Sequence, residues 1–206
     1  MLKYICKEIQ PPEATLTMTL SNEEMREIRT DRAEIYDGAV IHLTKDTVRL
    51  PDGSSSIREV AWHRGAVCIV PVTDAGEVVC VEQYRYPYDR VLLEIPAGKL
   101  EPGETDREAA ARRELAEETG YTAREMIDFG DYFGSPAILM EKITVFLALG
   151  LTPGETHPDE DEFLRVRPIP IGELTDRILK GEVPDGKTQA AVLRAKLYLE
   201  QKGILP

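Results

Sequence analysis

The sequence predicts a mixed α/β (α+β) fold, in which a sheet is flanked by helices. Segments rich in β-formers and segments rich in helix formers follow one another in the order strands, helix, strands, helices, which is typical of a sheet covered by helices. Apolar residues make up 42% and charged residues 30% of the 206 positions, as in an ordinary globular protein with a buried core.

The first segment, residues 1–32, is polar and carries little periodic pattern. Ser21 and Glu24 have the spacing of a capping box, in which two side chains three positions apart satisfy the free amides at a helix start. This spacing predicts a short helix over residues 22–28.

Residues 33–62 are rich in β-formers, and a Pro-Asp-Gly turn interrupts them at residues 51–53. We expect a small antiparallel β unit here. The chain is therefore divided into an N-terminal extension with this β unit, residues 1–62, and a main domain, residues 63–206.

Two apolar, β-rich runs, residues 66–72 and 78–84, are separated by the five turn-forming residues Thr73 to Glu77. This arrangement predicts a hairpin. Residues 92–96 are expected to form a short strand that ends at a proline.

The helix with the strongest signals covers residues 106–119, which are mostly alanine, arginine, glutamate and leucine. Gly120 follows, at the position where helices commonly end in a left-handed glycine. The remaining patterns predict strands at residues 127–132, 143–149 and 163–168 and helices at residues 171–180 and 188–202.

The chain carries 25 basic and 37 acidic residues, a formal net charge of −12. Binding to nucleic acid or to an anionic membrane needs a basic surface, so neither partner is expected. No apolar run is long enough to cross a bilayer, and residues 1–13 lack the apolar segment of a signal peptide. Cys68 and Cys80 lie in apolar runs, which predicts buried, reduced thiols in a cytoplasmic protein.

A carboxylate cluster is the most informative feature of the chain. Glu114, Glu117 and Glu118 share one face of the predicted helix, near its C-terminus, where the helix dipole disfavours negative charge. A solvated face is the plainer interpretation, but such a face normally alternates glutamate with lysine, and no lysine occurs between Lys99 and Lys142. The cluster therefore favours a hard divalent cation among its oxygens.

The loop and helix around this cluster resemble the Nudix box, the diphosphate-hydrolysing motif of the Nudix hydrolase superfamily. The resemblance rests on Gly98, Glu104 and the run RELAEETGY at residues 113–121, nine positions of defined type in all. The family pattern has seven residues between the first glutamate and the arginine, whereas eight stand here. We place the extra residue in the turn before the helix, where insertions cost little.

Further segments resemble the ADP-ribose pyrophosphatase branch of that superfamily. They are VEQYRYP at 81–87, LEIPAG at 93–98, the pair Ser135-Pro136, the acidic loop at 158–162 and DGKT at 185–188 before an Ala/Leu-rich helix. The similarity implies a Nudix-type α/β/α sandwich with a mixed sheet and a small N-terminal β unit. It also implies a homodimer in which the N-terminal unit packs across the partner and helps to form the nucleotide pocket.

The resemblance further implies a metal site on the predicted helix. Glu114 and Glu118, one turn apart, would ligate Mg²⁺ (with Mn²⁺ as the alternative) together with the backbone carbonyl of Ala97. Glu117 would be a direct ligand or bind through water, and Arg113 would orient these carboxylates. An acidic pocket can bind a diphosphate only through such cations or through arginine.

The catalytic base implied by the resemblance is Glu160 or Glu162 on the acidic loop. A solvated acidic run is the alternative interpretation of both residues. Arg85, at a strand end between two tyrosines, would pair with a phosphate or with the terminal ribose of the substrate, or else only with a nearby carboxylate.

The remaining substrate contacts are expected at four positions. Glu94 and Pro136 belong to the resembling segments and are assigned to substrate binding. Relatives often stack an aromatic residue on adenine near the N-terminal strand, where this chain has Gly-Ala-Val, so Tyr36 or Trp62 would have to serve. Core packing is the alternative role for Trp62.

The function implied is Mg²⁺-dependent hydrolysis of ADP-ribose to AMP and ribose 5-phosphate. One alternative is hydrolysis of another nucleoside diphosphate sugar. A different class is a non-catalytic Nudix sensor that binds ADP-ribose and regulates a partner, although such proteins usually lack the box carboxylates that this chain has.

Overall fold

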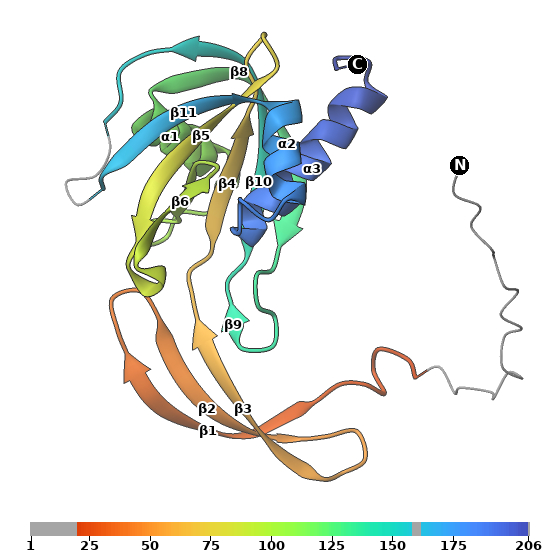
Figure 1. The fold of residues 1–206 in the computed structure, drawn as a ribbon. Coiled ribbons are helices and arrows are strands. Elements are labelled where there is room, and N and C mark those ends of the chain that lie inside the picture. Colours follow the sequence, from red (N-terminus) through yellow and green to blue (C-terminus); the bar gives the residue numbers. More distant parts are fainter. Residues whose placement is uncertain (1–19, 158–161, 206) are drawn as a thin grey trace, which may run out of the picture.

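The computed structural model describes residues 20–157 and 162–205. In this part of the chain, three sheets and three α-helices form a main body and an N-terminal sheet that projects from it (Figure 1). The α/β class expected from the order of the elements is confirmed. None of the helices described is both long enough and apolar enough to cross a membrane.

The N-terminal sheet has the order β1-β2-β3-β9. Strands β1 (Ile28–Asp37), β2 (His42–Arg49) and β3 (Ser55–Trp62) are antiparallel, which confirms the expected β unit. Strand β9 (Leu139–Met140) comes from the main body and pairs with β3 in parallel. This short pairing ties the projecting sheet to the rest of the molecule.

The helix predicted over residues 22–28 is wrong. The capping contacts do form, because the Ser21 amide donates to Oε2 of Glu24 at 2.8 Å and the Glu24 amide donates to Oγ of Ser21 at 3.3 Å. They close only a turn, and β1 begins at Ile28. A single helical turn is unstable unless it packs on something, and the residues of this turn are exposed.

The main body contains two sheets, with the orders β7-β4-β10-β8 and β11-β5-β6. The first contains β4 (Ala66–Pro71), β7 (Ala97–Lys99), β8 (Tyr121–Tyr132) and β10 (Ile143–Pro153). The second contains β5 (Glu77–Arg85), β6 (Arg90–Glu94) and β11 (Leu164–Pro170), and a short 3₁₀ turn, Tyr86–Tyr88, joins β5 to β6. Strands β4 and β10 are parallel and the other pairs are antiparallel, so the first sheet is mixed and the second is antiparallel.

The predicted hairpin of β4 and β5 is wrong, because the two strands belong to different sheets. Only the turn forms: the Thr73 amide donates to the carbonyl of Glu77 at 2.9 Å, and Val72 and Val78 make one isolated bridge. All six residues of β4 are buried, and both of its edges are occupied by strands distant in sequence, β7 and β10. A tight turn reverses the chain but leaves the choice of partner to such long-range pairings.

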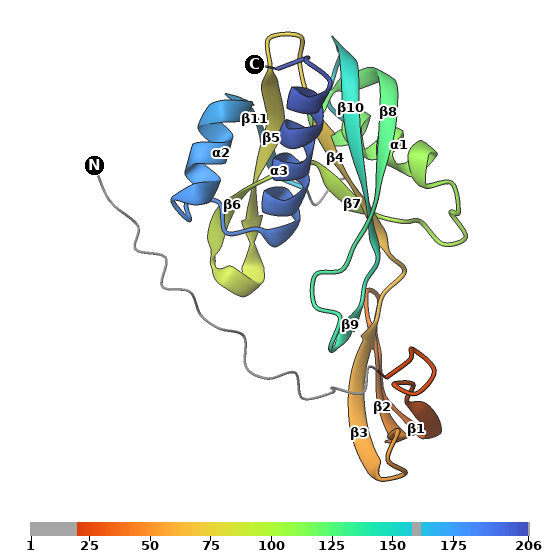
Figure 2. The same cartoon turned by 90° about the vertical axis from the view of Figure 1, so that its right-hand side faces the viewer.

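Alternate residues of β4 and β10 face two separate cores, as the two-residue period of a strand requires. Val67, Ile69 and Phe146 pack against helix α1 (Arg107–Thr119). Cys68 and Leu147 face the other way, in the core that includes α2 (Ile171–Leu179) and α3 (Gly186–Gln201). Helices α1 and α3 therefore cover opposite sides of these strands (Figure 2).

Helix α1 has the ends that its sequence predicts. Asp106 caps the start by accepting from the Ala109 amide at 3.0 Å, and Gly120 closes the end with a φ of 74°. Leu115 is fully buried in the core beneath α1, and the carboxylate positions on either side of it turn toward the edge of that core. The helix therefore presents its glutamates at the wall of a cavity.

Candidate active site

A cavity of about 910 Å³ opens where α1, the ends of β5 and β6 and the start of α3 meet. Its wall includes Arg85, Glu94, Ala97, Arg113, Glu114, Glu117 and Glu162 among the residues proposed for the site. Glu118 lies behind this wall, with only 3% of its surface exposed. Seven of the predicted site residues therefore line one cavity, and an eighth lies next to it.

Arg113 connects the carboxylates of the motif. Its Nη1 donates to Glu114 and to Glu117, each at 2.9 Å, and its Nη2 donates to Glu104 at 3.2 Å. The extra residue before the helix therefore leaves the contact between Glu104 and Arg113 intact. Burial alone would lower the pKa of Arg113, but Glu114, Glu104 and Glu117 outweigh this effect and raise the pKa above its ordinary value.

Glu114 is packed against the backbone of β7 in a way that explains the glycine at the start of the motif. A Cβ on Gly98 would lie 1.9 Å from the carboxyl carbon of Glu114. Burial raises the pKa of Glu114 to about 7, although Arg113 opposes this shift. Any larger residue at position 98 would push the carboxylate out of its present place.

Glu118 is more deeply buried than Glu114. Its Oε2 accepts a hydrogen bond from the Ala97 amide at 3.2 Å, which fixes the carboxylate beside the backbone of β7. Burial, followed by the charges of Glu162 and Glu114, raises the pKa of Glu118 to about 8. Arg113 at Glu114 and Arg85 at Glu118 offset the effect of burial only in part, so both carboxylates keep raised pKa values.

This donor set fits a hard divalent cation, which prefers carboxylate oxygens and would lower the cost of burying them. Within residues 20–157 and 162–205, no three or more His, Cys, Asp or Glu side chains already stand in a complete metal-binding arrangement. One oxygen of Glu114 is held by Arg113 instead. The fit therefore rests on the chemistry and burial of Glu114 and Glu118.

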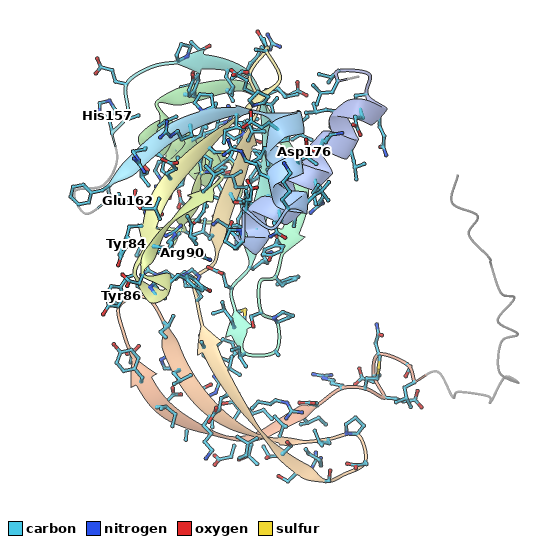
Figure 3. All side chains as sticks on the ribbon, in the orientation of Figure 1. Tyr84, Tyr86, Arg90, His157, Glu162 and Asp176 are labelled. Carbon is cyan, nitrogen blue, oxygen red and sulfur yellow. The ribbon has the colours of Figure 1, made fainter. Side chains whose placement is uncertain are left out.

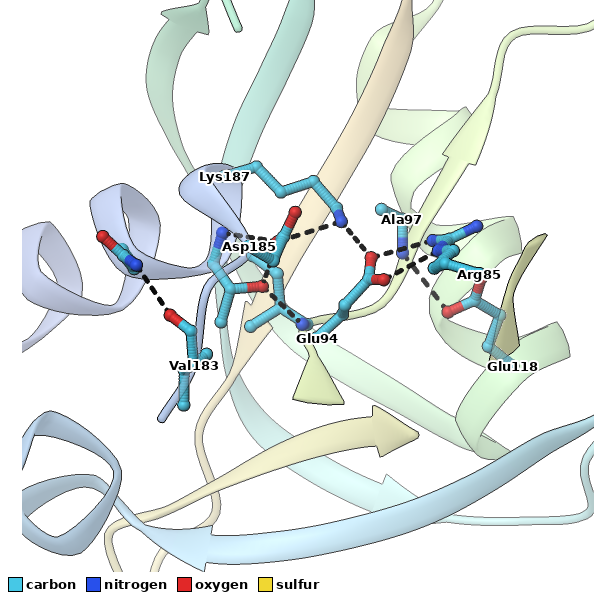
Figure 4. Close-up of polar contacts among 10 residues, drawn as sticks. Arg85, Glu94, Ala97, Glu118, Val183, Asp185 and Lys187 are labelled. Atoms are coloured by element: carbon cyan, nitrogen blue, oxygen red, sulfur yellow. Dashed lines mark hydrogen bonds and ion pairs between the residues drawn. The ribbon is translucent and has the colours of Figure 1, made fainter. Parts of the chain in front are cut away.

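Arg85 pairs with a nearby carboxylate, that of Glu94, which was one of the two roles expected for it. Its Nε donates to Oε1 of Glu94 at 2.7 Å, and its Nη2 donates to Oε2 at 2.8 Å. Burial would raise the pKa of Glu94, but Arg85 and Lys187 outweigh burial and hold it below its ordinary value. Lys187 and Asp185 complete this network (Figure 4), and sequence reasoning gave neither a role, although both belong to the DGKT segment.

Glu162, the last residue of the acidic run, lies at the cavity wall just before β11 (Figure 3). The charge of Glu162 contributes to the raised pKa values of both Glu114 and Glu118. The His157 amide donates to the carbonyl of Glu117 at 3.0 Å, so the chain before the loop is tied to α1. Glu160, the other residue predicted as the base, lies outside the residues described.

Three predicted substrate contacts do not lie at the cavity of this chain. Tyr36 is 58% exposed on β1, and Pro136 is exposed in the connection between β8 and β9. Trp62 ends β3, where its Nε1 donates to Oγ1 of Thr44 at 2.9 Å and Arg32 lies 4.6 Å from its ring centre. Their assignment to substrate binding stays a prediction.

Comparison with known proteins places this chain in a family. Residues 62–192 match the model of the NUDIX domain. The chain is 40% identical over 176 residues to the ADP-ribose pyrophosphatase of Bacillus subtilis (strain 168), which covers 84% of this chain and 92% of the relative. It is 40% identical over 171 residues to the methanol dehydrogenase activator of Bacillus methanolicus, covering 82% and 91%.

A solved structure has the same fold. It is described as an ADP compounds hydrolase, and it covers 87% of this chain and 97% of its own, with a TM-score of 0.76 and 21% sequence identity. The loop, the capped helix and the carboxylate face built above are the parts that the resemblance to the Nudix box predicted. By its sequence match over most of its length and by its fold, this chain belongs to the Nudix family.

Proposed function

We propose that this protein hydrolyses the diphosphate bond of ADP-ribose, with AMP and ribose 5-phosphate as products and Mg²⁺ (or Mn²⁺) as cofactor. One observation carries the proposal: the buried pair Glu114 and Glu118 borders the cavity into which Arg85 also projects. Cation ligands and a phosphate-binding guanidinium thus share one site. The name of the Bacillus subtilis relative, ADP-ribose pyrophosphatase, supports the choice of substrate.

Glu114 and Glu118 would hold the metal ion, with the carbonyl of Ala97 as a further ligand and Glu117 binding directly or through water. When bound, the ion would polarise a phosphoryl oxygen and lower the pKa of a water molecule. Arg113 holds the carboxylates of Glu114 and Glu117 from behind, so that they need little reorganisation to accept a cation.

Glu162 or Glu160 acts as the general base that removes a proton from the attacking water. Glu162 is supported by its place at the cavity wall and by its electrostatic influence on both buried carboxylates. Glu160 belongs to the same short acidic run. A base carried on a loop suits a site that closes around its substrate.

Arg85 binds a phosphate of the substrate, and Glu94 keeps its guanidinium in place. Two further cations of the cavity wall, Lys99 and Arg64, compensate for the acidic surroundings. The substrate is thus recognised by local positive charge within a protein whose formal net charge is −12.

The working unit is a cytoplasmic homodimer. The N-terminal sheet and the turn between β1 and β2 carry apolar side chains that are exposed in the described chain, namely Ile28, Ile35, Tyr36, Val40, Ile41 and Ile57. An exposed apolar surface of this kind fits a protein partner. In this dimer, a second copy packed on the sheet brings Tyr36 or Trp62 to the nucleotide bound by its partner.

A substrate panel tests the proposal. The purified protein is given ADP-ribose, UDP-glucose and GDP-mannose with Mg²⁺, and products are separated by anion-exchange chromatography. We expect ADP-ribose to be the best substrate and to yield AMP. Faster turnover of a UDP- or GDP-sugar would replace ADP-ribose with that substrate class.

A second measurement separates the enzyme from a non-catalytic sensor. Glu118→Gln should lower ADP-ribose turnover by a factor on the order of a thousand, while circular dichroism shows the fold intact. ADP-ribose binding without turnover by the unmodified protein would instead support a sensor.

A further inference from the structure

Asp185 and Lys187 line the cavity but have no part in the mechanism described so far. They stand at the start of α3, in the DGKT segment. The Lys187 side chain is only 11% exposed, and its ammonium donates to Oδ2 of Asp185 at 3.0 Å and to Oε2 of Glu94 (Figure 4). A lysine this deeply buried needs such acceptors, since burying an ammonium without them is costly.

Glu94 is the centre of the network. Its carboxylate is almost fully buried at the end of β6, and its Oε2 is shared by Lys187 and Arg85. Lys187, Arg85, Glu94 and Asp185 together are two cations and two carboxylates, so their formal charges cancel. The network joins the neighbouring strands β5 and β6 to the distant start of α3, and Lys187 and Glu94 are 93 positions apart.

Asp185, which holds the Lys187 ammonium, is itself fixed in place by hydrogen bonds. Its Oδ2 accepts from the Thr188 amide at 2.9 Å and from the Thr188 hydroxyl at 2.6 Å, and so caps α3. That hydroxyl in turn accepts from the Ile95 amide at 3.0 Å. A Cβ on Gly186 would lie 2.7 Å from the hydroxyl of Tyr132, so the turn is also packed against β8.

The guanidinium of Arg85 is held on one side only. Its Nε and Nη2 are both used by Glu94, and within the described residues Nη1 makes no hydrogen bond. Because a guanidinium is planar, this two-point contact sets the direction in which Nη1 points. The side chain is 37% exposed and lies at the cavity that Glu114 also lines.

We propose that Lys187, held by Asp185, is a positioning residue: it fixes the carboxylate of Glu94 and thereby aims Nη1 of Arg85 at a substrate phosphate. Without Lys187, the Glu94 carboxylate is held by one long side chain alone, and both can move together. This inference rests on the proposed hydrolysis of a nucleoside diphosphate sugar. It adds to that function a part for the start of α3.

A double-mutant cycle tests the inference, because residues that act through one another have non-additive effects. Lys187→Met, Arg85→Met and the double variant are compared by KM and kcat, and by calorimetric titration of ADP-ribose in EDTA. Lys187→Met should raise both KM and the metal-free dissociation constant roughly tenfold, as expected for loosening one charge-assisted contact, with kcat within about twofold. In the Arg85→Met variant, adding Lys187→Met should raise KM and the dissociation constant by less than about twofold.

A purely structural role for Lys187 predicts a different pattern. Its effects would then multiply with those of Arg85→Met, and this result would overturn the inference. Lys196→Met, the same substitution further along α3, is the matched control and should leave KM unchanged. Asp185→Asn keeps an oxygen to cap α3 but removes the charge that holds Lys187, so it should reproduce the coupling with Arg85 if Lys187→Met fails to fold.

The outcome of the substrate panel keeps the two proposals apart. If another nucleoside diphosphate sugar is the best substrate, the cycle is run with that sugar and the same coupling is expected. An active protein with multiplicative effects contradicts the positioning role alone. A protein that neither binds nor hydrolyses any of these sugars contradicts the proposed function and the positioning role together.

Discussion

Glu118→Gln should stabilise the metal-free protein at alkaline pH, although it removes a metal ligand. The folded-state pKa of Glu118 is about 8, against 4.5 for the free side chain, because of burial and the charges of Glu162 and Glu114. Ionising Glu118 therefore opposes folding. The cost is absent below pH 4.5, grows as the pH rises toward 8 and is constant above it.

The size of the effect follows from this difference in pKa. From 4.5 to about 8, at ~1.4 kcal/mol per pH unit, the cost of ionisation is roughly 5 kcal/mol. Glu114 and Glu162 interact with Glu118, so the three carboxylates titrate together and the cost cannot be assigned to Glu118 alone. We therefore expect Glu118→Gln to recover a little less than half of this ionisation cost, ~2 kcal/mol. A glutamine can still accept the hydrogen bond from the Ala97 amide, so the substitution opens no gap in the structure.

Thermal unfolding followed by circular dichroism measures the effect. In EDTA at pH 8, Tm should rise by about 4–8 °C in Glu118→Gln, and this gain should shrink to about a third at pH 5.5, which lies only one pH unit above the pKa of the free side chain. Mg²⁺ at pH 8 should raise the Tm of the unmodified protein and so reduce the difference in Tm between it and Glu118→Gln. Glu59→Gln, an exposed carboxylate of β3, is the charge-matched control and should change Tm little at either pH. A gain of the same size at both pH values would refute the reasoning, as would a loss of stability at pH 8.

Two further predictions concern the cavity and the N-terminal sheet. Gly98→Ala should lower kcat/KM at least tenfold and weaken Mg²⁺ binding by calorimetry, because its Cβ would displace the Glu114 carboxylate, whereas Gly172→Ala meets no atom within 4 Å and should leave activity unchanged. Normal kinetics in Gly98→Ala would show that Glu114 tolerates another position. Ile35→Asp, on the exposed apolar face of β1, should give a monomer by sedimentation with an ADP-ribose KM at least tenfold higher, and Leu197→Asp, exposed on α3, should not. An unchanged sedimentation coefficient for Ile35→Asp would exclude this face as the dimer contact.

Local signals in the sequence predicted local structure well. Gly120 marks the end of α1, and the start predicted at residue 106 is within one residue of the observed start, Arg107, because both depend on hydrogen bonds to the adjacent turn. The carboxylate face of α1 was predictable for the same reason, since helical spacing alone brings Glu114 and Glu118 together. Ser21 and Glu24 show the limit of this reasoning: their contacts formed, but no helix followed.

Long-range structure was the part that the sequence could not predict. The partners of β4 are distant strands, and nothing in the run of residues 66–72 distinguishes them from an adjacent hairpin strand. The contact of Lys187 with Glu94 likewise depends on how α3 docks against β6. Resemblance to a family pointed to the DGKT segment, yet only the folded geometry shows what its lysine touches.

The loop between β6 and β7 has a consequence for how this protein could lose its activity in evolution. The Ile95 amide is bound by Thr188 of α3, and the Ala97 amide is bound by Glu118 of α1, so helices on opposite sides close the same loop. Glu118 thus has a structural role, since it holds the Ala97 amide, as well as being a proposed metal ligand. A duplicated copy that drifted into a non-catalytic role would be expected to keep an oxygen at position 118, as glutamine, rather than lose the side chain. A glutamine at position 118 would then indicate descent from an active enzyme.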